Sequence, residues 1–118
     1  MCGISGVINF QNIQKTNLEN ILTAMTDSIA HRGPDNDGLW IDDDISVALG
    51  HRRLAIIDLS PGGKQPMHSS TGRYVVTYNG EIYNYREVKK CLEKKGHVFR
   101  TSSDTEVMLA SLEEDGLE

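Results

Sequence analysis

Hydrophobic residues near the start of the chain recur at spacings that predict a strand followed by a helix. The run from Cys2 to Phe10 is apolar, small and partly β-branched, which predicts a buried strand. Apolar residues at steps of three and four then follow Asn17, a favourable N-cap residue, and predict an amphipathic helix over residues 18–30. The apolar stripe of this helix consists of Leu18, Ile21, Leu22, Met25 and Ile29. The segment 31–35, which contains a glycine and a proline, is expected to end the helix.

The middle of the chain alternates short apolar runs with turn residues, a pattern typical of short strands. We expect strands at 38–41, 45–49, 54–58 and 73–78, and turns at 42–44 and 60–63. Because these strands come in local clusters, they favour antiparallel pairing.

A second helix is predicted to begin at Asn84, whose side chain can act as a cap while Glu87 reaches back to it. The helix is expected to end at Gly96, in the position after the C-cap where glycine is favoured. Its apolar stripe consists of Tyr85, Val88, Cys91 and Leu92.

A third helix is predicted to begin with the capping-box pattern from Ser103 to Glu106 and to stop near Gly116. Its apolar face consists of Val107, Met108 and Leu112. No repeat, low-complexity tract or linker separates the predicted elements. We therefore expect residues 1–118 to form a single domain of mixed helices and strands.

Composition narrows the class of protein. The 118 residues carry a formal net charge of -5, which excludes a basic nucleic-acid binder and indicates an acidic, soluble domain. No apolar run approaches the roughly 18 residues needed to cross a bilayer, and the N-terminus lacks the features of a signal peptide. We expect no membrane partner and a cytoplasmic location.

Cys2 is the first candidate for chemistry. A cysteine after Met1 is small enough for a methionine aminopeptidase to expose, so one residue could carry both a thiol and a free α-amino group. The amine could then take the thiol proton and act as the base. The alternative is that Cys2 is a small core residue, which is what most free cysteines are. Cys91 lies in a predicted apolar stripe and is interpreted as structural.

Five segments together resemble class II glutamine amidotransferase domains, most of all the N-terminal domain of glutamine-hydrolysing asparagine synthetases. The segments lie at 1–6 (MCGISG), 31–35 (HRGPD), 50–58 (GHRRLAIID), 78–84 (YNGEIYN) and 103–106 (SDTE). They stand in the family's order and span essentially the whole chain. The resemblance implies hydrolysis of the glutamine side-chain amide to glutamate and ammonia, with Cys2 as the nucleophile.

The resemblance also implies that Asn79 and Gly80 form the oxyanion hole. Thiolate attack on an amide creates an oxyanion that needs hydrogen-bond donors, and an Asn side chain and a Gly N–H after a strand can point to one place. The alternative is a hairpin turn, for which Asn-Gly is the commonest two-residue signal.

Glutamine has an α-carboxylate and an α-ammonium, so its selective capture requires a cation and one or two anions. The family's arginine directly before leucine selects Arg53 rather than Arg52 for the carboxylate, and neighbouring strand residues face opposite sides. By resemblance, Glu81 and Asp104 meet the α-ammonium. The alternatives are a helix N-terminal charge for Asp104 and a solvated charge pair for the two arginines, which we accept for Arg52.

The four histidines do not change this interpretation. No Cys-x-x-Cys or His-x-x-x-His spacing is present, so we predict no metal site, and neither His31 nor His51 is expected to act as a base. His31 is expected to shape the loop near the nucleophile, whereas His68 and His97 are expected at the surface.

The family's fold is an α+β sandwich of antiparallel sheets between helical layers, the N-terminal-nucleophile hydrolase type. Members continue past the position of Glu118 with further strands and a synthetase domain, so the sandwich is expected to be incomplete here. We expect no cofactor for this domain, with ATP and magnesium serving only a synthetase domain, and L-glutamine and a synthetase domain or subunit as partners. A homo-oligomer is left open.

Two alternatives to this function stay open. The chain could be a non-catalytic fragment that keeps the fold and binds glutamine, or an N-terminal-nucleophile hydrolase acting on another amide. The second alternative fits Arg53 and Asp104 poorly, because polar groups without a matching head group are costly to bury.

Overall fold

The structure, a computed structural model, describes residues 1–56 and 59–117. These residues fall into two units. The first unit consists of Met1–Leu54, Lys64–Pro66 and Thr77–Asn79, and the second consists of the remaining described residues. Each unit is described by itself below.

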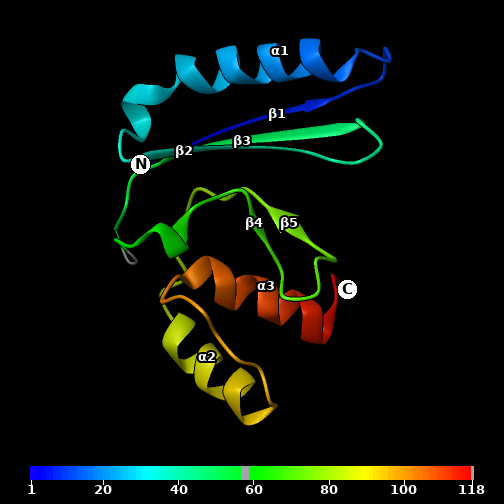
Figure 1. The fold of residues 1–118 in the computed structure, drawn as a ribbon. Helices are drawn as coiled ribbons and strands as arrows, with labels where there is room; N and C mark the ends of the chain where they lie inside the picture. The colour runs from blue at the N-terminus through cyan, green and yellow to red at the C-terminus, as the bar shows by residue number, and fades with distance from the viewer. Residues whose placement is uncertain (57–58, 118) are drawn as a thin grey trace. The chain divides into compact units, whose positions relative to one another are not determined.

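The first unit is built on a three-stranded antiparallel sheet with the order β1-β3-β2. Its strands are β1 (Gly3–Ile8), β2 (Asn36–Ile41) and β3 (Val47–Arg53). The helix α1 (Lys15–Ser28) covers one face of this sheet, as Figure 1 shows. Leu18 and Leu22 of α1 pack with Ala48 of β3 to form a fully buried core.

A glycine in β3 allows α1 to approach the sheet closely. Gly50 pairs with Ser5, and a Cβ at Gly50 would collide with the hydroxyls of both Ser5 and Thr26. These two hydroxyls lie 2.9 Å apart and are hydrogen-bonded to each other. Any larger residue at position 50 would therefore separate the helix from the strand pair.

The opposite face of the sheet carries His51, because strand residues alternate between faces. Two short segments, 64–66 and 77–79, belong to this unit and contact this face. Nε2 of His51 lies 3.3 Å from the carbonyl oxygen of Tyr78, and the N–H of Tyr78 donates to Oε1 of Gln65 at 2.6 Å. A Cβ at Gly38 would collide with the backbone carbonyl of Gln65, so the glycine makes room for the first segment.

The second unit contains a small hairpin and two helices. Strands β4 (Met67–His68) and β5 (Val75–Val76) pair antiparallel, and helices α2 (Tyr85–Lys94) and α3 (Asp104–Asp115) follow them in the chain. Leu92, Val107 and Leu109 are its buried apolar side chains. Figure 1 shows α2 and α3 as neighbours within this unit.

Several local predictions are confirmed. The Ser103 hydroxyl accepts the N–H of Thr105 at 3.1 Å, which is the expected cap of α3. Gly96 has φ +98 just past the end of α2, a conformation that favours glycine. Glu106 does not complete the capping box, since it accepts the N–H groups of Arg100 and Thr101 instead.

The prediction that Asn17 caps the first helix is wrong. The helix begins at Lys15 after Gln14, because the N–H of Leu18 bonds to the Gln14 carbonyl and places Asn17 inside the first turn. The Asn84 side chain likewise makes no capping hydrogen bond, although α2 begins where it was expected.

The predicted strands differ from the observed ones mainly in length. The strand expected at 45–49 runs from Val47 to Arg53, because both β1 and β2 pair along it. The local pattern of apolar residues does not reveal these backbone hydrogen bonds. The strand expected at 54–58 is absent at 54–56, and residues 57–58 lie outside the described part. The strand expected at 73–78 is reduced to Val75–Val76.

The strand β1 is buried on one face only, in contrast to the prediction of a buried strand. Ile4 and Ile8 are 51% and 63% exposed, because α1 covers only the face that carries Ser5 and Val7. Cys91 is also exposed rather than part of a buried stripe on α2.

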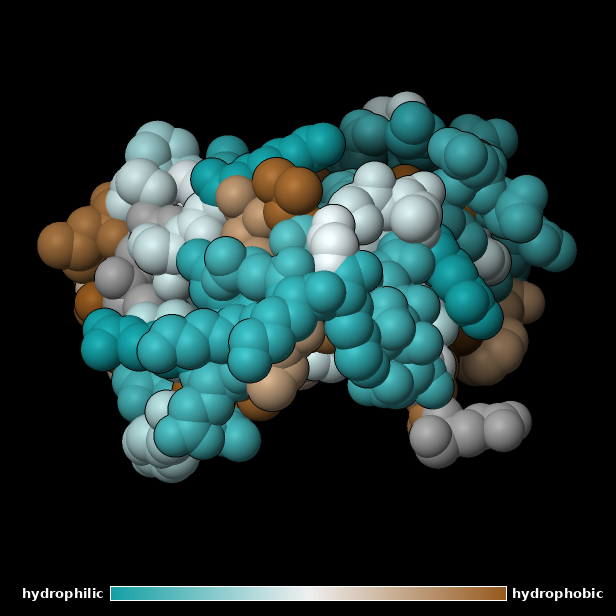
Figure 2. All heavy atoms as spheres, turned by 90° about the horizontal axis from the view of Figure 1, so that it is seen from below, coloured by the Kyte–Doolittle hydropathy of each residue, from teal (hydrophilic) through white to brown (hydrophobic). Residues whose placement is uncertain are grey.

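Hydrophilic residues cover most of the face of the molecule that Figure 2 shows, and hydrophobic side chains appear there in separate small groups. Among the helices of the described residues, none combines the length and the apolar character needed to cross a membrane.

We predict that His51 makes folding pH-dependent. Burial lowers the pKa of His51 below its ordinary value of 6.5, and the charge of Arg53 lowers it further, against the opposing effect of the hydrogen bond with Tyr78. As pH falls below about 6.5, the unfolded chain takes up a proton that the folded chain resists, so the free energy of unfolding should fall. It should be fully retained above that pH.

Urea unfolding between about pH 8 and pH 5 measures this effect, and His51→Gln should remove much of the loss because glutamine does not titrate. The control His68→Gln replaces an exposed histidine of β4 and tests whether loss of any imidazole has the same effect. Equal pH dependence in the wild type and His51→Gln would contradict the prediction.

Candidate functional site

The first unit contains a pocket of about 250 Å³ at the start of β1. It is lined by Cys2, Gly3, Ile4, Ile29, Arg32 and Asn79. Two of the predicted catalytic residues, Cys2 and Asn79, therefore lie at one pocket although they are far apart in the sequence.

The position of Cys2 follows from the pairing of β1 with β3. Gly3 pairs with Arg52, so the residue before Gly3 comes next to the residues that follow β3. The sulfur of Cys2 accepts the N–H of Leu54 at 3.3 Å, and it lies 3.6 Å from the Leu54 carbonyl, to which the thiol can donate. Backbone groups thus hold a half-buried sulfur at the pocket wall.

Asn79 is half-buried and follows Tyr78, the residue that His51 and Gln65 contact. The next residue, Gly80, is exposed. The alternative of a hairpin turn at Asn79 and Gly80 is wrong, because residues 81–84 form no returning strand and the chain enters α2 at Tyr85.

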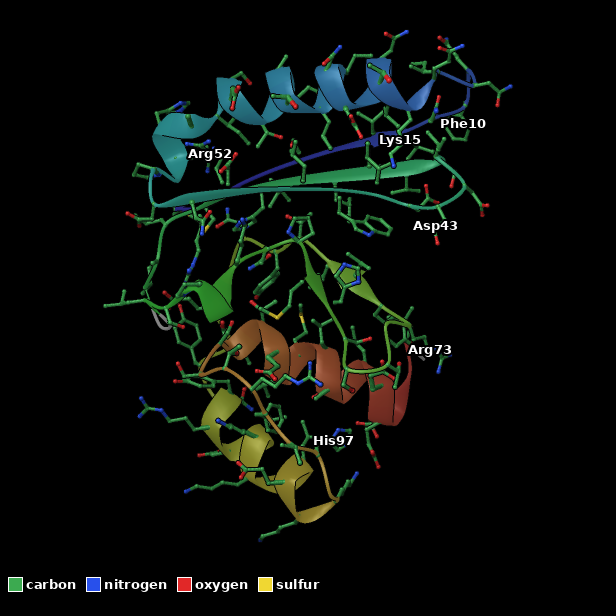
Figure 3. The ribbon with its side chains drawn as sticks, viewed as in Figure 1. Phe10, Lys15, Asp43, Arg52, Arg73 and His97 are labelled. Carbon is green, nitrogen blue, oxygen red and sulfur yellow. The ribbon has the colours of Figure 1, made fainter. Side chains whose placement is uncertain are left out.

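Arg52 and Arg53 face opposite sides of the sheet, as predicted for strand neighbours. Arg53 is 7% exposed and lies on the face that carries His51. The side chain of Arg52 points toward the end of α1, and Figure 3 shows it between that helix and the sheet.

Arg52 is held by the protein rather than solvated, so the expectation of a solvated charge is wrong for this residue. Its side chain is 16% exposed, and its Nε donates to the carbonyl of Gly33 at 3.2 Å. Its Nη1 also lies 3.8 Å from Asp27 and 4.0 Å from Asp37. Arg52 therefore joins α1, β2 and the loop between them.

Glu81 and Asp104 belong to the second unit. Asp104 is the first residue of α3 and is 6% exposed, whereas Glu81 is exposed. Oδ2 of Asp104 accepts the N–H of Ile82 at 2.9 Å, so the buried carboxylate holds the residue directly after Glu81. Its place in the first turn also lets it interact favourably with the helix dipole.

Arg32 is a pocket residue that sequence reasoning did not single out. The motif at 31–35 was interpreted as a loop near the nucleophile, and the 3₁₀ helix η1 (Ala30–Arg32) that follows α1 places Arg32 at the same pocket as Cys2. The sequence shows a cation within that motif. Its position beside the start of β1 depends on the tertiary fold, which the local sequence does not specify.

The other histidines are not among the residues that line this pocket. His31 and His68 are exposed, whereas His97, labelled in Figure 3, is half-buried and pairs with Glu114 at 2.8 Å. The hydrogen bond from His97 lowers the pKa of the Glu114 carboxyl. Within residues 1–56 and 59–117, no cluster of His, Cys, Asp and Glu has the arrangement needed to hold a metal ion.

Comparison with known proteins gives the family. Residues 1–118 match the model of the glutamine amidotransferase domain family. The chain is 46% identical over 112 residues to asparagine synthetase [glutamine-hydrolyzing] 1 of Bacillus subtilis, which covers 94% of this chain and 17% of the relative. It is 41% identical over 113 residues to asparagine synthetase [glutamine-hydrolyzing] 3 of the same organism, covering 94% of this chain and 18% of the relative.

A third relative, amidase chry2 of Gibberella zeae, is 40% identical over 125 residues, covering 99% of this chain and 18% of the relative. The chain thus spans less than a fifth of the length of each of these three proteins. Since the family model covers the whole sequence, the chain belongs to the glutamine amidotransferase domain family.

Proposed function

We propose that this chain carries out glutamine hydrolysis as the ammonia-supplying part of an amidotransferase of the asparagine synthetase type. The observation that supports the proposal is that Cys2 and Asn79 line the same pocket. A nucleophile and an oxyanion donor at one pocket are what acyl transfer from an amide requires.

In the proposed reaction, Met1 is removed and the α-amine of Cys2 takes the thiol proton. The thiolate attacks the side-chain carbonyl carbon of glutamine, and the Asn79 side chain and the Gly80 N–H stabilise the oxyanion. Return of the proton expels ammonia and leaves a thioester on Cys2. Water then attacks the thioester, which releases glutamate and restores the thiol.

Recognition of glutamine is proposed to rest on charge. Arg53 lies on the sheet face opposite α1, and we expect its planar guanidinium to bind the α-carboxylate in a two-pronged contact. Glu81 and Asp104 are proposed to meet the α-ammonium. The fixed position of Asp104 at the start of α3 supports this role, since a buried carboxylate keeps its geometry.

The wider context is also a proposal. The complete domain is expected to be the N-terminal-nucleophile hydrolase sandwich, in which further strands join the antiparallel sheets. A synthetase domain or subunit is expected to receive the ammonia and to use ATP and magnesium, whereas glutamine hydrolysis itself uses no cofactor. We propose a cytoplasmic protein whose product is asparagine.

Retention of Met1 should abolish glutaminase activity. The proposed base is the α-amine of Cys2, which is an amide nitrogen as long as Met1 is attached. Mass analysis of the N-terminus shows whether Met1 is retained, and an assay of glutamate release on the same preparation measures the activity. Full turnover by protein that retains Met1 or carries an N-terminal tag would contradict this mechanism.

Cys2→Ala should remove glutamate release to below detection, because no other group in the proposed mechanism can form the thioester. Cys91→Ala is the matched control, since it removes the second thiol from an exposed position on α2. We expect this control to turn over at close to the wild-type rate. A Cys2→Ala protein that still forms glutamate would overturn the assignment of the nucleophile.

Arg53→Ala should raise the KM for glutamine, with a loss of about 1.5–3 kcal/mol for a charge-assisted contact. Steady-state kinetics with glutamine measure the change, and urea unfolding shows whether the variant is folded. The matched control is Arg52→Ala, which faces α1 and should lower stability more than it raises KM. An unchanged KM in folded Arg53→Ala would remove the assignment of the carboxylate site.

A further inference from the structure

The segment 77–79 is attached to the sheet by individual hydrogen bonds rather than by strand pairing. It lies outside β5, which ends at Val76. The Thr77 hydroxyl donates to the carbonyl of Gly50 at 3.2 Å. Tyr78 is bonded through both its N–H and its carbonyl, to Gln65 and His51 respectively.

The bond between His51 and Tyr78 helps to fix the position of the Asn79 backbone. The Tyr78 carbonyl belongs to the same planar peptide unit as the nitrogen and Cα of Asn79. Holding this carbonyl therefore fixes the position of the Cα atom from which the Asn79 side chain leaves the backbone. The bond from the Tyr78 N–H to Gln65 fixes the preceding peptide unit in the same way.

Both partner side chains are themselves held in place. His51 is 1% exposed and Gln65 is 7% exposed. A carbonyl only accepts hydrogen bonds, so Nε2 of His51 must carry the hydrogen that Tyr78 receives. Nδ1 of His51 is then an acceptor, and it has no partner among residues 1–56 and 59–117. A second proton would fall on a buried ring close to Arg53, which disfavours it.

We propose that His51 and Gln65 are positioning residues for catalysis, which hold Tyr78 from both sides and so keep Asn79 in place at the Cys2 pocket. The proposal rests on the proposed glutamine hydrolysis, because it assumes that Asn79 donates to the oxyanion. Neither residue lines the pocket, so both act through the backbone of Tyr78. A displacement of about 1 Å in such a group can lower a rate by about 100-fold.

The test compares kcat and KM for glutamine hydrolysis in the purified protein. Asn79→Ala should lower kcat by about 100- to 1000-fold, as expected for the loss of an oxyanion donor. His51→Leu and Gln65→Met should each lower kcat by about 10- to 100-fold with KM nearly unchanged, because the oxyanion exists only after attack. His51→Gln retains an amide N–H near the position of Nε2 and should recover most of kcat.

The double variant His51→Leu/Asn79→Ala separates positioning from a general structural effect. If His51 acts through Asn79, the double variant should be no slower than Asn79→Ala alone. Multiplied losses in the double variant, or a wild-type kcat in folded His51→Leu and Gln65→Met, would overturn the proposal. His68→Leu is the control for loss of a histidine and should stay within about 2-fold of wild type.

Failure of the proposed function has a different signature. A wild-type protein with free Cys2 that releases no glutamate would overturn the function, and the positioning role with it. An active wild type whose Asn79→Ala variant keeps full kcat would remove only the oxyanion role and the positioning built on it. If His51→Leu does not fold, as judged by urea unfolding, Gln65→Met and its double variant with Asn79→Ala give the same comparison.

Discussion

The pairing of β1 with the central strand β3 is the constraint on which the site depends. Its register places Gly3 opposite Arg52, and this brings Cys2 to the backbone of Leu54. The same register places Gly50 opposite Ser5, where α1 can approach because no Cβ is present. A slip by one residue would turn each strand side chain to the other face, and it would also remove the glycine from under the helix. Packing against α1 therefore fixes the position of the nucleophile.

The two faces of this sheet serve different purposes. The face toward α1 carries the apolar core of Leu18, Leu22 and Ala48, and burial of these side chains is the main source of its stabilisation. The opposite face carries His51 and Arg53, which are buried polar groups and need defined partners to offset the cost of leaving water. Hydrogen bonds are directional, so the bonds from this face restrict the orientation of the segment 77–79 more closely than apolar packing alone would.

The sequence predicted the local features of the fold better than the long-range ones. The cap at Ser103 and the glycine after α2 depend on neighbouring residues, and both are present. The alternation of Arg52 and Arg53 follows from strand geometry and is also observed. The length of β3 was underestimated because its charged end is strand only through pairing with two other strands. The expectation that the loop at 31–35 lies near the nucleophile agrees with the place of Arg32 at the Cys2 pocket, although the sequence assigned this arginine no role of its own.

The nucleophile and the proposed oxyanion donor are held by different kinds of interaction. Main-chain atoms of Leu54 hold the sulfur of Cys2, and these atoms are present whatever side chain stands at position 54. Asn79 instead depends on the side chains of His51 and Gln65, which come from a strand and from a separate loop segment. Substitutions at these two positions can therefore change the donor side of the pocket while the sulfur stays where it is. Specific side chains are therefore required on the side of the proposed oxyanion donor, Asn79. The oxyanion forms only during the reaction, so small errors in the geometry of its donor affect the rate more than they affect substrate binding.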